Sequence, residues 1–189
     1  MKPKRLFQTL KLMLISESSE RAKYLKEKKI FASVGEGCSY MNRTVPLYPE
    51  LIKLGDNVHL ASNVSFLTHD ISFLVLNNLC GEKKFKERIG CIEICDNTFV
   101  GAGVRIMYDT RIGKNCIIAS GSVVTHDIPD NCVAGGVPAK VICSIDDYIE
   151  KYNSKAAYPE ELRPRRQTVS PELADWMWTD FEARHKTGF

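Results

Sequence analysis

A six-residue repeat limits what this chain can fold into more than any other feature. From Ile94 the sequence divides into consecutive hexads, ICDNTF, VGAGVR, IMYDTR, IGKNCI, IASGSV and VTHDIP. The first residue of every hexad is Ile or Val, the fourth is Asn, Asp or Gly, and the fifth is small or β-branched. A fixed period of this kind indicates a solenoid, and hexads are one signature of a parallel β-helix.

Each position of the hexad has its own physical role in such a coil. The first residue fills the interior, and the fifth completes the same buried layer. The fourth residue lies at a corner where φ is expected to be positive, which favours Asn, Asp and Gly. The corner residues of this run are Asn97, Gly103, Asp109, Asn115, Gly121 and Asp127. We therefore predict one short strand and one turn per hexad, stacked around a continuous core.

Earlier copies of the hexad are interrupted between Val34 and Leu54, which lie three hexads plus two residues apart, and again after Phe66. They begin at Val34, Leu54, Leu60 and Phe66, and the distance from Phe66 to Ile94 is not a multiple of six. We expect residues 70–90 to leave the coil as a loop, and long insertions in solenoids are usually binding features. The interrupted hexad, FLTHDI, places His69 at the fourth, corner position.

The two ends of the chain lack the repeat. Residues 1–30 are predicted to form a helical cap on the coil 31–142, with a stripe formed by Leu6, Leu10, Met13 and Leu14. A basic amphipathic membrane contact is the alternative for this helix. Residues 143–189 are predicted to hold a C-terminal helix and a tail. Ser144 is a candidate N-cap with Asp147 three residues on, and a second helix covers residues 171–184.

Composition excludes several classes of protein. The net charge of +3 comes without a basic stripe, so the sequence does not suggest a nucleic-acid partner. The seven cysteines follow no metal-ligand spacing and are expected to be reduced thiols in a cytoplasmic protein. No signal peptide and no apolar run of roughly 18 residues is apparent, so we expect no integral membrane contact.

Two motifs extend the argument from fold to family. The sequence T-H-D interrupts the repeat at residues 68–70, and AGGVPAKVI closes it at residues 134–142. With the hexads, they resemble the hexapeptide-repeat acyltransferases from Val34 to Ile142. The resemblance is closest to sugar O-acetyltransferases of polysaccharide gene clusters, in the same broad group as the maltose and galactoside acetyltransferases. It implies a left-handed parallel β-helix, a homotrimer with active sites between subunits, and acetyl-CoA as donor, with no metal.

His69 has two readings. A histidine can simply occupy a corner, because His is enriched among residues that tolerate positive φ. The resemblance instead implies a general base. A hydroxyl attacks a thioester poorly until its proton is removed, and imidazole, with a pKa near 6.5, suits that task at neutral pH. Asp70 could orient the ring of His69 or could be a solvated carboxylate beside the substrate.

The resemblance also implies residues for the two substrates. Ala102 and Ser120 match residues whose backbone contacts the pantetheine arm, although the repeat alone also explains small residues there. Thr125 and His126 follow on the next coil, and His126 stands where the family usually has Lys. Lys140 matches a basic residue near the nucleotide phosphates, which suits a point charge. On the acceptor side, Asn42 and Arg43 are either ligands for sugar hydroxyls or surface polar residues.

The sequence-based prediction is the transfer of an acetyl group from acetyl-CoA to a sugar hydroxyl in surface polysaccharide biosynthesis. The acceptor would be a sugar or a nucleotide-linked or lipid-linked sugar, and an amino sugar or small amine is the alternative. A zinc hydratase on the same coil needs three histidine ligands, two of them five residues apart. The histidines at 59, 69, 126 and 185 contain no such pair. A non-catalytic coil would need neither T-H-D nor G-V-P-A-K.

Overall fold

The fold was analysed in a computed structural model, which describes residues 3–153, 158–164 and 168–185 of the 189-residue chain. The chain forms two compact units, residues 1–148 and 149–189. The boundary lies inside the helix α4 (Ile145–Asn153), later than residue 142, where the hexads end. The site described below belongs entirely to the first unit.

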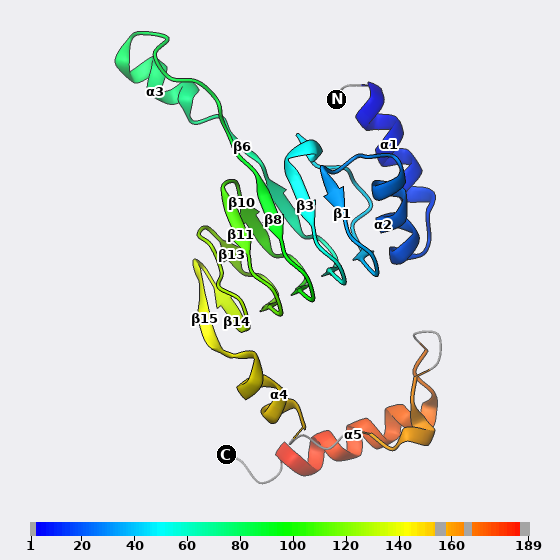
Figure 1. The fold of residues 1–189 in the computed structure, drawn as a ribbon. Helices are drawn as coiled ribbons and strands as arrows, with labels where there is room; N and C mark the ends of the chain where they lie inside the picture. The colour runs from blue at the N-terminus through cyan, green and yellow to red at the C-terminus, as the bar shows by residue number, and fades with distance from the viewer. Residues whose placement is uncertain (1–2, 154–157, 165–167, 186–189) are drawn as a thin grey trace. The chain divides into compact units, whose positions relative to one another are not determined.

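The first unit is a coil of short strands in three sheets (Figure 1). One sheet contains β1 (Ser33–Val34), β3 (Ile52–Leu54), β8 (Ile92–Ile94) and β11 (Thr110–Ile112). The second contains β5 (Ser65–Leu67), β10 (Arg105–Met107) and β13 (Val123–Val124). The third contains β2 (Ser39–Tyr40), β4 (His59–Leu60), β9 (Phe99–Val100), β12 (Ile117–Ile118), β14 (Cys132–Gly136) and β15 (Ala139–Ser144). All neighbours in these sheets are parallel except β14 and β15.

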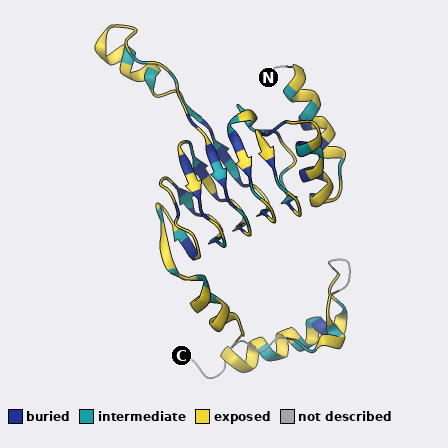
Figure 2. Cartoon of the chain, in the orientation of Figure 1, coloured by how far each residue is buried: buried dark blue, intermediate teal, exposed yellow. Residues whose placement is uncertain are grey.

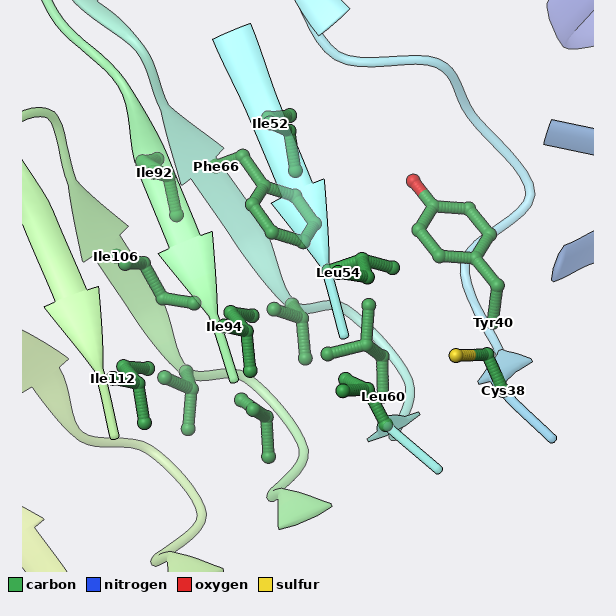
Figure 3. Packing of buried hydrophobic residues seen from close by; sticks show 14 of the residues in the cluster. Cys38, Tyr40, Ile52, Leu54, Leu60, Phe66, Ile92, Ile94, Ile106 and Ile112 are labelled. Atoms are coloured by element: carbon green, nitrogen blue, oxygen red, sulfur yellow. The ribbon is translucent and has the colours of Figure 1, made fainter. Parts of the chain in front are cut away.

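Equivalent hexad positions stack on one another from coil to coil. Ile106 pairs with Phe66 on one side and Val124 on the other, and Ile94 lies between Leu54 and Ile112. All first-position and fifth-position residues of the hexads from Ile94 to Ile128 are buried. Figure 3 shows the first-position side chains packed in one interior column. The predicted parallel coil and its core are confirmed.

The predicted corners are confirmed with two exceptions. Positive φ is found at Asn57, Asn63, Asn97, Gly103, Asp109, Asn115 and Gly121. Asp127 does not adopt it, and its carboxylate instead accepts a hydrogen bond from the Arg111 N–H at 2.8 Å. The corner assignment of His69 is also wrong. The chain leaves the coil here, so His69 lies in the strand β6 (His69–Asp70), which pairs antiparallel with β7 (Arg88–Ile89).

The N-terminal segment forms two helices, α1 (Pro3–Leu14) and α2 (Ser18–Glu27). Leu12, Ala22 and Leu25 join the hydrophobic core, and α2 lies against β1 and β2. The predicted stripe of α1 does not face the coil, because its four members are 44–82% exposed (Figure 2). The buried residues of α1 are Thr9 and Leu12. The Thr9 hydroxyl accepts the Val45 N–H at 3.2 Å, so this polar residue fixes the helix on the coil.

Arg21 of α2 joins the two helices to the first coil. It is 2% exposed, and its guanidinium donates to the backbone oxygens of Tyr40 at 2.7 Å, Ile15 at 2.7 Å and Ser16 at 2.8 Å. Burial lowers the pKa of Arg21. The side chain therefore donates to three carbonyl groups, of which, among the described residues, only Ile15 has a further donor, Arg43 at 3.5 Å.

The segment predicted as a loop is an arm with its own secondary structure. It leaves the coil through β6, forms α3 (Phe73–Cys80), and returns through β7 (Figure 1). None of the residues of α3 is buried, although the helix contains Phe73, Leu74, Val75, Leu76 and Leu79. The hexad count located the departure from the coil but gave no information on the structure of the insertion.

The C-terminal helices agree with their sequence signals. Ser144 precedes α4, and its hydroxyl accepts the Asp147 N–H at 3.1 Å as predicted for an N-cap. In the second unit, the short helix η2 (Glu160–Leu162) precedes α5 (Pro171–His185). Ser170 caps α5 through the Leu173 N–H at 3.2 Å, and Leu173 is buried.

The structure explains why cysteines occur at the fifth position of hexads. Cys116 is 1% exposed, its thiol donates to the Pro129 oxygen at 3.1 Å, and burial raises its pKa. Such a thiol is a poor nucleophile. Cys116→Ser is expected to retain most of the activity and to lose about 1 kcal/mol of stability, because Ser122 satisfies the equivalent position. Turnover and urea unfolding measure this, and lost turnover in a folded variant would assign Cys116 a chemical role.

Candidate active site

The structure places His69 where the arm joins the coil. His69 pairs with Ile89 of β7, and Asp70 pairs with Arg88. The Nδ1 atom of His69 is buried and has no hydrogen-bond partner among the described residues. A buried polar atom without a partner is uncommon and often marks a functional position.

Tyr48 forms one wall beside His69. Its ring meets the imidazole edge to face, with the ring centroids 5.5 Å apart at an angle of 87°. The Tyr48 hydroxyl donates to both carboxylate oxygens of Glu87 at 3.3 Å. Partial burial and the Glu87 carboxylate raise the pKa of this hydroxyl, which keeps it a donor. Tyr48 thus links the coil, the catalytic candidate and the segment of the arm that leads into β7.

The backbone around Tyr48 is fixed from two sides. Tyr48 has φ 48° and ψ 53°, and it precedes the short helix η1 (Pro49–Leu51). The left-handed conformation is costly for an aromatic residue and persists only where the surroundings impose it. The Thr68 hydroxyl, fully buried, donates to the Leu47 oxygen at 2.7 Å and ties this segment to the strand that carries His69.

Asp70 is held away from the His69 ring. Its Oδ1 accepts the Ser72 N–H at 2.5 Å, and its Oδ2 accepts the Tyr108 hydroxyl at 3.4 Å. The bonds from Ser72, aided by Tyr108 and Arg88, lower the pKa of Asp70 and keep it ionised. Nδ1 of His69 has no partner among the described residues, so no hydrogen bond joins it to Asp70, and a role of Asp70 in orienting the ring stays a prediction. Its carboxylate connects β6 to Ser72 and Tyr108 at the base of the arm.

The remaining predicted site residues lie at two different edges of the coil. The turn that follows β13 contains Thr125 and His126, and it lies on the same edge as His69. His126 is exposed, and its Nδ1 is 2.8 Å from the Thr125 hydroxyl oxygen. Ala102 and Ser120 are exposed at another edge and stack through the Gly121 N–H and the Ala102 oxygen at 2.8 Å. The strands β5, β10 and β13 separate the two edges, so one chain does not bring these residues together.

Lys140 and the acceptor candidates lie elsewhere. Lys140 is exposed on β15 opposite Gly135. The Asn42 amide donates to the Val64 oxygen at 2.6 Å and accepts the Val64 N–H at 3.1 Å, which joins adjacent coils. Arg43 donates to the Met13 oxygen at 2.7 Å and so holds α1. These contacts give Asn42 and Arg43 structural partners, but both residues also line a hollow of about 570 Å³, so binding of sugar hydroxyls stays a prediction.

The other histidines have structural partners. His59 bonds to Ser39 at 2.9 Å and to Asn57 at 2.8 Å, within a row of asparagines along one edge. His185 bonds to the Phe181 oxygen at 2.7 Å.

Within residues 3–153, 158–164 and 168–185, no three His, Cys, Asp or Glu side chains gather as a metal site would require. None of the helices that the structure describes could cross a bilayer.

Sequence reasoning missed Tyr48, Glu87 and Tyr108. Tyr48 and Glu87 lie in irregular segments that interrupt the repeat, so no period predicts which side chains they present. Tyr108 lies inside a hexad, but only the arm brings Asp70 to it. The length of the insertion was the sole sequence signal that this region could contribute residues to the site.

Comparison with known proteins places these features in context. A family model described as bacterial transferase hexapeptide (six repeats) matches residues 92–126. Protein CapG of Staphylococcus aureus is 36% identical over 171 residues, which cover 88% of this chain and 92% of CapG. Galactoside O-acetyltransferase of Escherichia coli strain K12 is 33% identical over 163 residues, or 74% of this chain and 76% of that protein. The solved structure of a galactoside acetyltransferase in complex with coenzyme A superposes with a TM-score of 0.57 at 28% identity, covering 83% of this chain and 88% of that one.

Proposed function

Because the chain belongs to the hexapeptide-repeat transferases, we propose that it is an acetyltransferase that moves the acetyl group of acetyl-CoA to a sugar hydroxyl. The observation that carries this proposal is the position of His69, which lies beside Tyr48 at the base of the arm with one buried ring nitrogen. The similarity to an O-acetyltransferase over three quarters of the chain supports the same chemistry. The resemblance in the sequence motifs supports an acceptor from surface polysaccharide biosynthesis.

In the proposed mechanism, His69 acts as the general base. Its outer nitrogen takes the proton of the acceptor hydroxyl as the hydroxyl oxygen attacks the thioester carbon. The C–S bond then breaks, and the imidazolium returns the proton to the leaving thiolate, so the ring is regenerated. Tyr48 limits the orientations of the ring through its edge contact. An imidazole ring suits both steps because the neutral ring accepts a proton in the first and the imidazolium donates it in the second.

We further propose a left-handed coil and a cyclic trimer with the active site between subunits. Two features of the single chain support the trimer. The residues expected to contact the donor lie at two separate edges of the coil. In addition, α3 contains no buried residue despite its apolar composition. A closed heterologous interface would bring unlike edges of neighbouring chains together and could cover such a helix. The seven unpaired thiols support a cytoplasmic location.

The donor is proposed to contact Ala102, Ser120, Thr125, His126 and Lys140. Lys140→Ala is expected to raise the KM for acetyl-CoA by about five- to thirty-fold with a smaller change in kcat, because one charge-assisted contact to a phosphate is lost. Initial rates at varied donor and saturating acceptor measure both constants. Lys23→Ala, an exposed lysine of α2, is the matched control. An unchanged KM in Lys140→Ala would place the phosphates elsewhere.

An acceptor panel tests the proposed function. Thiol release from acetyl-CoA is followed with free sugars, sugar phosphates, amino sugars and small amines, and products are identified by mass. Acceptor-dependent release with a base-labile acetylated sugar is the expected result. A product stable to mild base would indicate an amide and therefore the alternative N-acetyltransferase. If no acceptor increases release above the rate of hydrolysis, acetyl transfer to sugars is wrong for this chain.

A further inference from the structure

A hollow of about 590 Å³ lies next to the wall that touches His69. It is lined by residues of α1, by the end of the turn after α2, and by the segment from Leu47 to Glu50. Three of its lining residues are cations, Lys4, Arg5 and Lys29. This hollow contains none of the residues that the sequence motifs assign to the reaction.

The cations of the hollow form no ion pair with any carboxylate among the described residues. Neither Lys4 nor Arg5 nor Lys29 belongs to any of the ion pairs in this part of the chain. The Nε atom of Arg5 is buried and has no hydrogen-bond partner in the described part of the chain. Arg21 differs, because its guanidinium donates to three carbonyl oxygens. A buried arginine in the N-terminal helices can therefore find hydrogen-bond partners within the protein. A buried charged donor without a partner is costly, so a ligand that accepts its hydrogen bond would gain affinity.

Backbone strain marks the same hollow. Of the described non-glycine residues with positive φ, all are Asn or Asp except Lys29, at 47°, and Tyr48, at 48°. Both exceptions line the hollow. Such conformations cost a Lys or Tyr residue about 1 kcal/mol or more, and they cluster at ligand sites. Both residues line one hollow, in which the Nε atom of Arg5 also lacks a hydrogen-bond partner among the described residues.

Charge balance selects the class of ligand. Lys4, Arg5 and Lys29 supply three positive charges, and Glu50 is the one carboxylate in the lining, which leaves two positive charges. A phosphomonoester carries about −1.5 to −2 at pH 7, whereas a carboxylate carries one charge. An arginine fork with lysine point charges is also the usual protein partner of phosphate.

Tyr48 connects this hollow to the reaction. It lines the hollow, and its ring meets the His69 ring at 5.5 Å between centroids. We infer that the hollow binds the phosphate of a phosphorylated sugar acceptor, which holds the attached sugar so that its hydroxyl reaches His69. This inference rests on the proposed function and narrows its acceptor to sugar phosphates or sugar diphosphates.

A binding measurement tests the hollow without any catalysis. Equilibrium dialysis of the full chain with labelled inorganic pyrophosphate is expected to show binding that weakens as salt rises. Arg5→Gln and Lys29→Asn are expected to weaken it by about 10- to 100-fold, the worth of a charge-assisted contact. Asn at position 29 suits the left-handed backbone, so this variant removes the charge while preserving the fold. The control Lys23→Gln makes the same change of charge on α2, outside the hollow.

Kinetics then assign the ligand to the acceptor. With sugar 1-phosphates, Arg5→Gln and Lys29→Asn are expected to raise the acceptor KM by about 10- to 100-fold and to leave the donor KM unchanged. With unphosphorylated sugars, the same variants are expected to match the unsubstituted enzyme. Circular dichroism and thermal unfolding confirm that each variant is folded.

The outcomes separate this inference from the proposed function. No pyrophosphate binding, or equal binding by Arg5→Gln and the unsubstituted chain, would overturn the phosphate site even if sugars are acetylated. A raised donor KM, or displacement of pyrophosphate by coenzyme A, would assign the hollow to the donor and also overturn it. Charge-dependent pyrophosphate binding without acetyl transfer to any sugar would support the site and reject the proposed function.

Discussion

Replacement of His69 by Asn is expected to lower kcat by about 10²- to 10⁴-fold in a protein that still folds and binds acetyl-CoA. The reason is that Asn retains a planar polar side chain but cannot accept the proton of the acceptor hydroxyl. The surroundings of position 69 do not depend on imidazole, since β6 is held by its pairing with β7. Single-turnover rates at saturating donor and acceptor measure the loss, and donor binding is measured separately by calorimetry.

Two companion variants make the His69 test specific. Tyr48→Phe retains the ring that touches His69 and removes only the hydroxyl that bonds to Glu87, so a much smaller loss is expected. His69→Ala leaves room for a small base, so added imidazole is expected to restore part of the rate. Near-normal turnover in His69→Asn with a confirmed acceptor would reject the general base and leave His69 a structural residue of the arm.

Asn at position 69 has no left-handed corner to preserve. The hexad pattern suggests Asn because it is the most frequent corner residue, as at Asn57, Asn63, Asn97 and Asn115. Position 69 is an extended strand and has no left-handed backbone to preserve. The substitution remains informative because it separates polarity and size from proton transfer, not because it preserves a corner.

Arg21→Met is expected to lower the free energy of unfolding by about 3–5 kcal/mol, the largest effect on stability among these variants. Methionine fills a similar volume but removes the Arg21 bonds to the oxygens of Tyr40, Ile15 and Ser16, and leaves Ile15 only the 3.5 Å bond from Arg43. These carbonyls close the turn between α1 and α2 and attach it to β2, so the whole cap is expected to loosen. Urea unfolding measures the change at one protein concentration, since assembly would make stability depend on concentration.

Arg43→Met is the matched control for Arg21→Met. Arg43 also donates to the Ile15 oxygen, at 3.5 Å, and to the Met13 oxygen at 2.7 Å, but it is exposed and water can replace it. A loss of about 1 kcal/mol or less is expected. Equal losses of unfolding free energy in the two variants would show that burial does not determine how much these hydrogen bonds contribute to stability. An Arg21→Met protein as stable as the unsubstituted chain would mean that α1 and α2 rest on apolar contacts alone.

The hexads predict the coil from local information. Each hexad requires an apolar residue at the first position, a small or β-branched residue at the fifth and a residue that tolerates a left-handed backbone at the fourth. Each requirement is set within the coil that contains the residue. Because every coil repeats these requirements, the period alone predicts the strands, the core residues and most corners. The N-cap at Ser144 is equally local and is found where the sequence indicates it.

The site depends on contacts that the period does not describe. Tyr48 reaches His69 from an irregular segment 21 positions earlier in the chain, and Glu87 reaches Tyr48 from 39 positions later. The orientation of α1, the burial of Arg21 and the cationic hollow likewise arise from segments packed against the end of the coil. The sequence by itself determined the coil and the point near His69 at which the chain leaves it, because a repeat encodes its own neighbours. Only the tertiary structure decided what surrounds that histidine, because side chains outside a repeat meet through packing between segments that share no period.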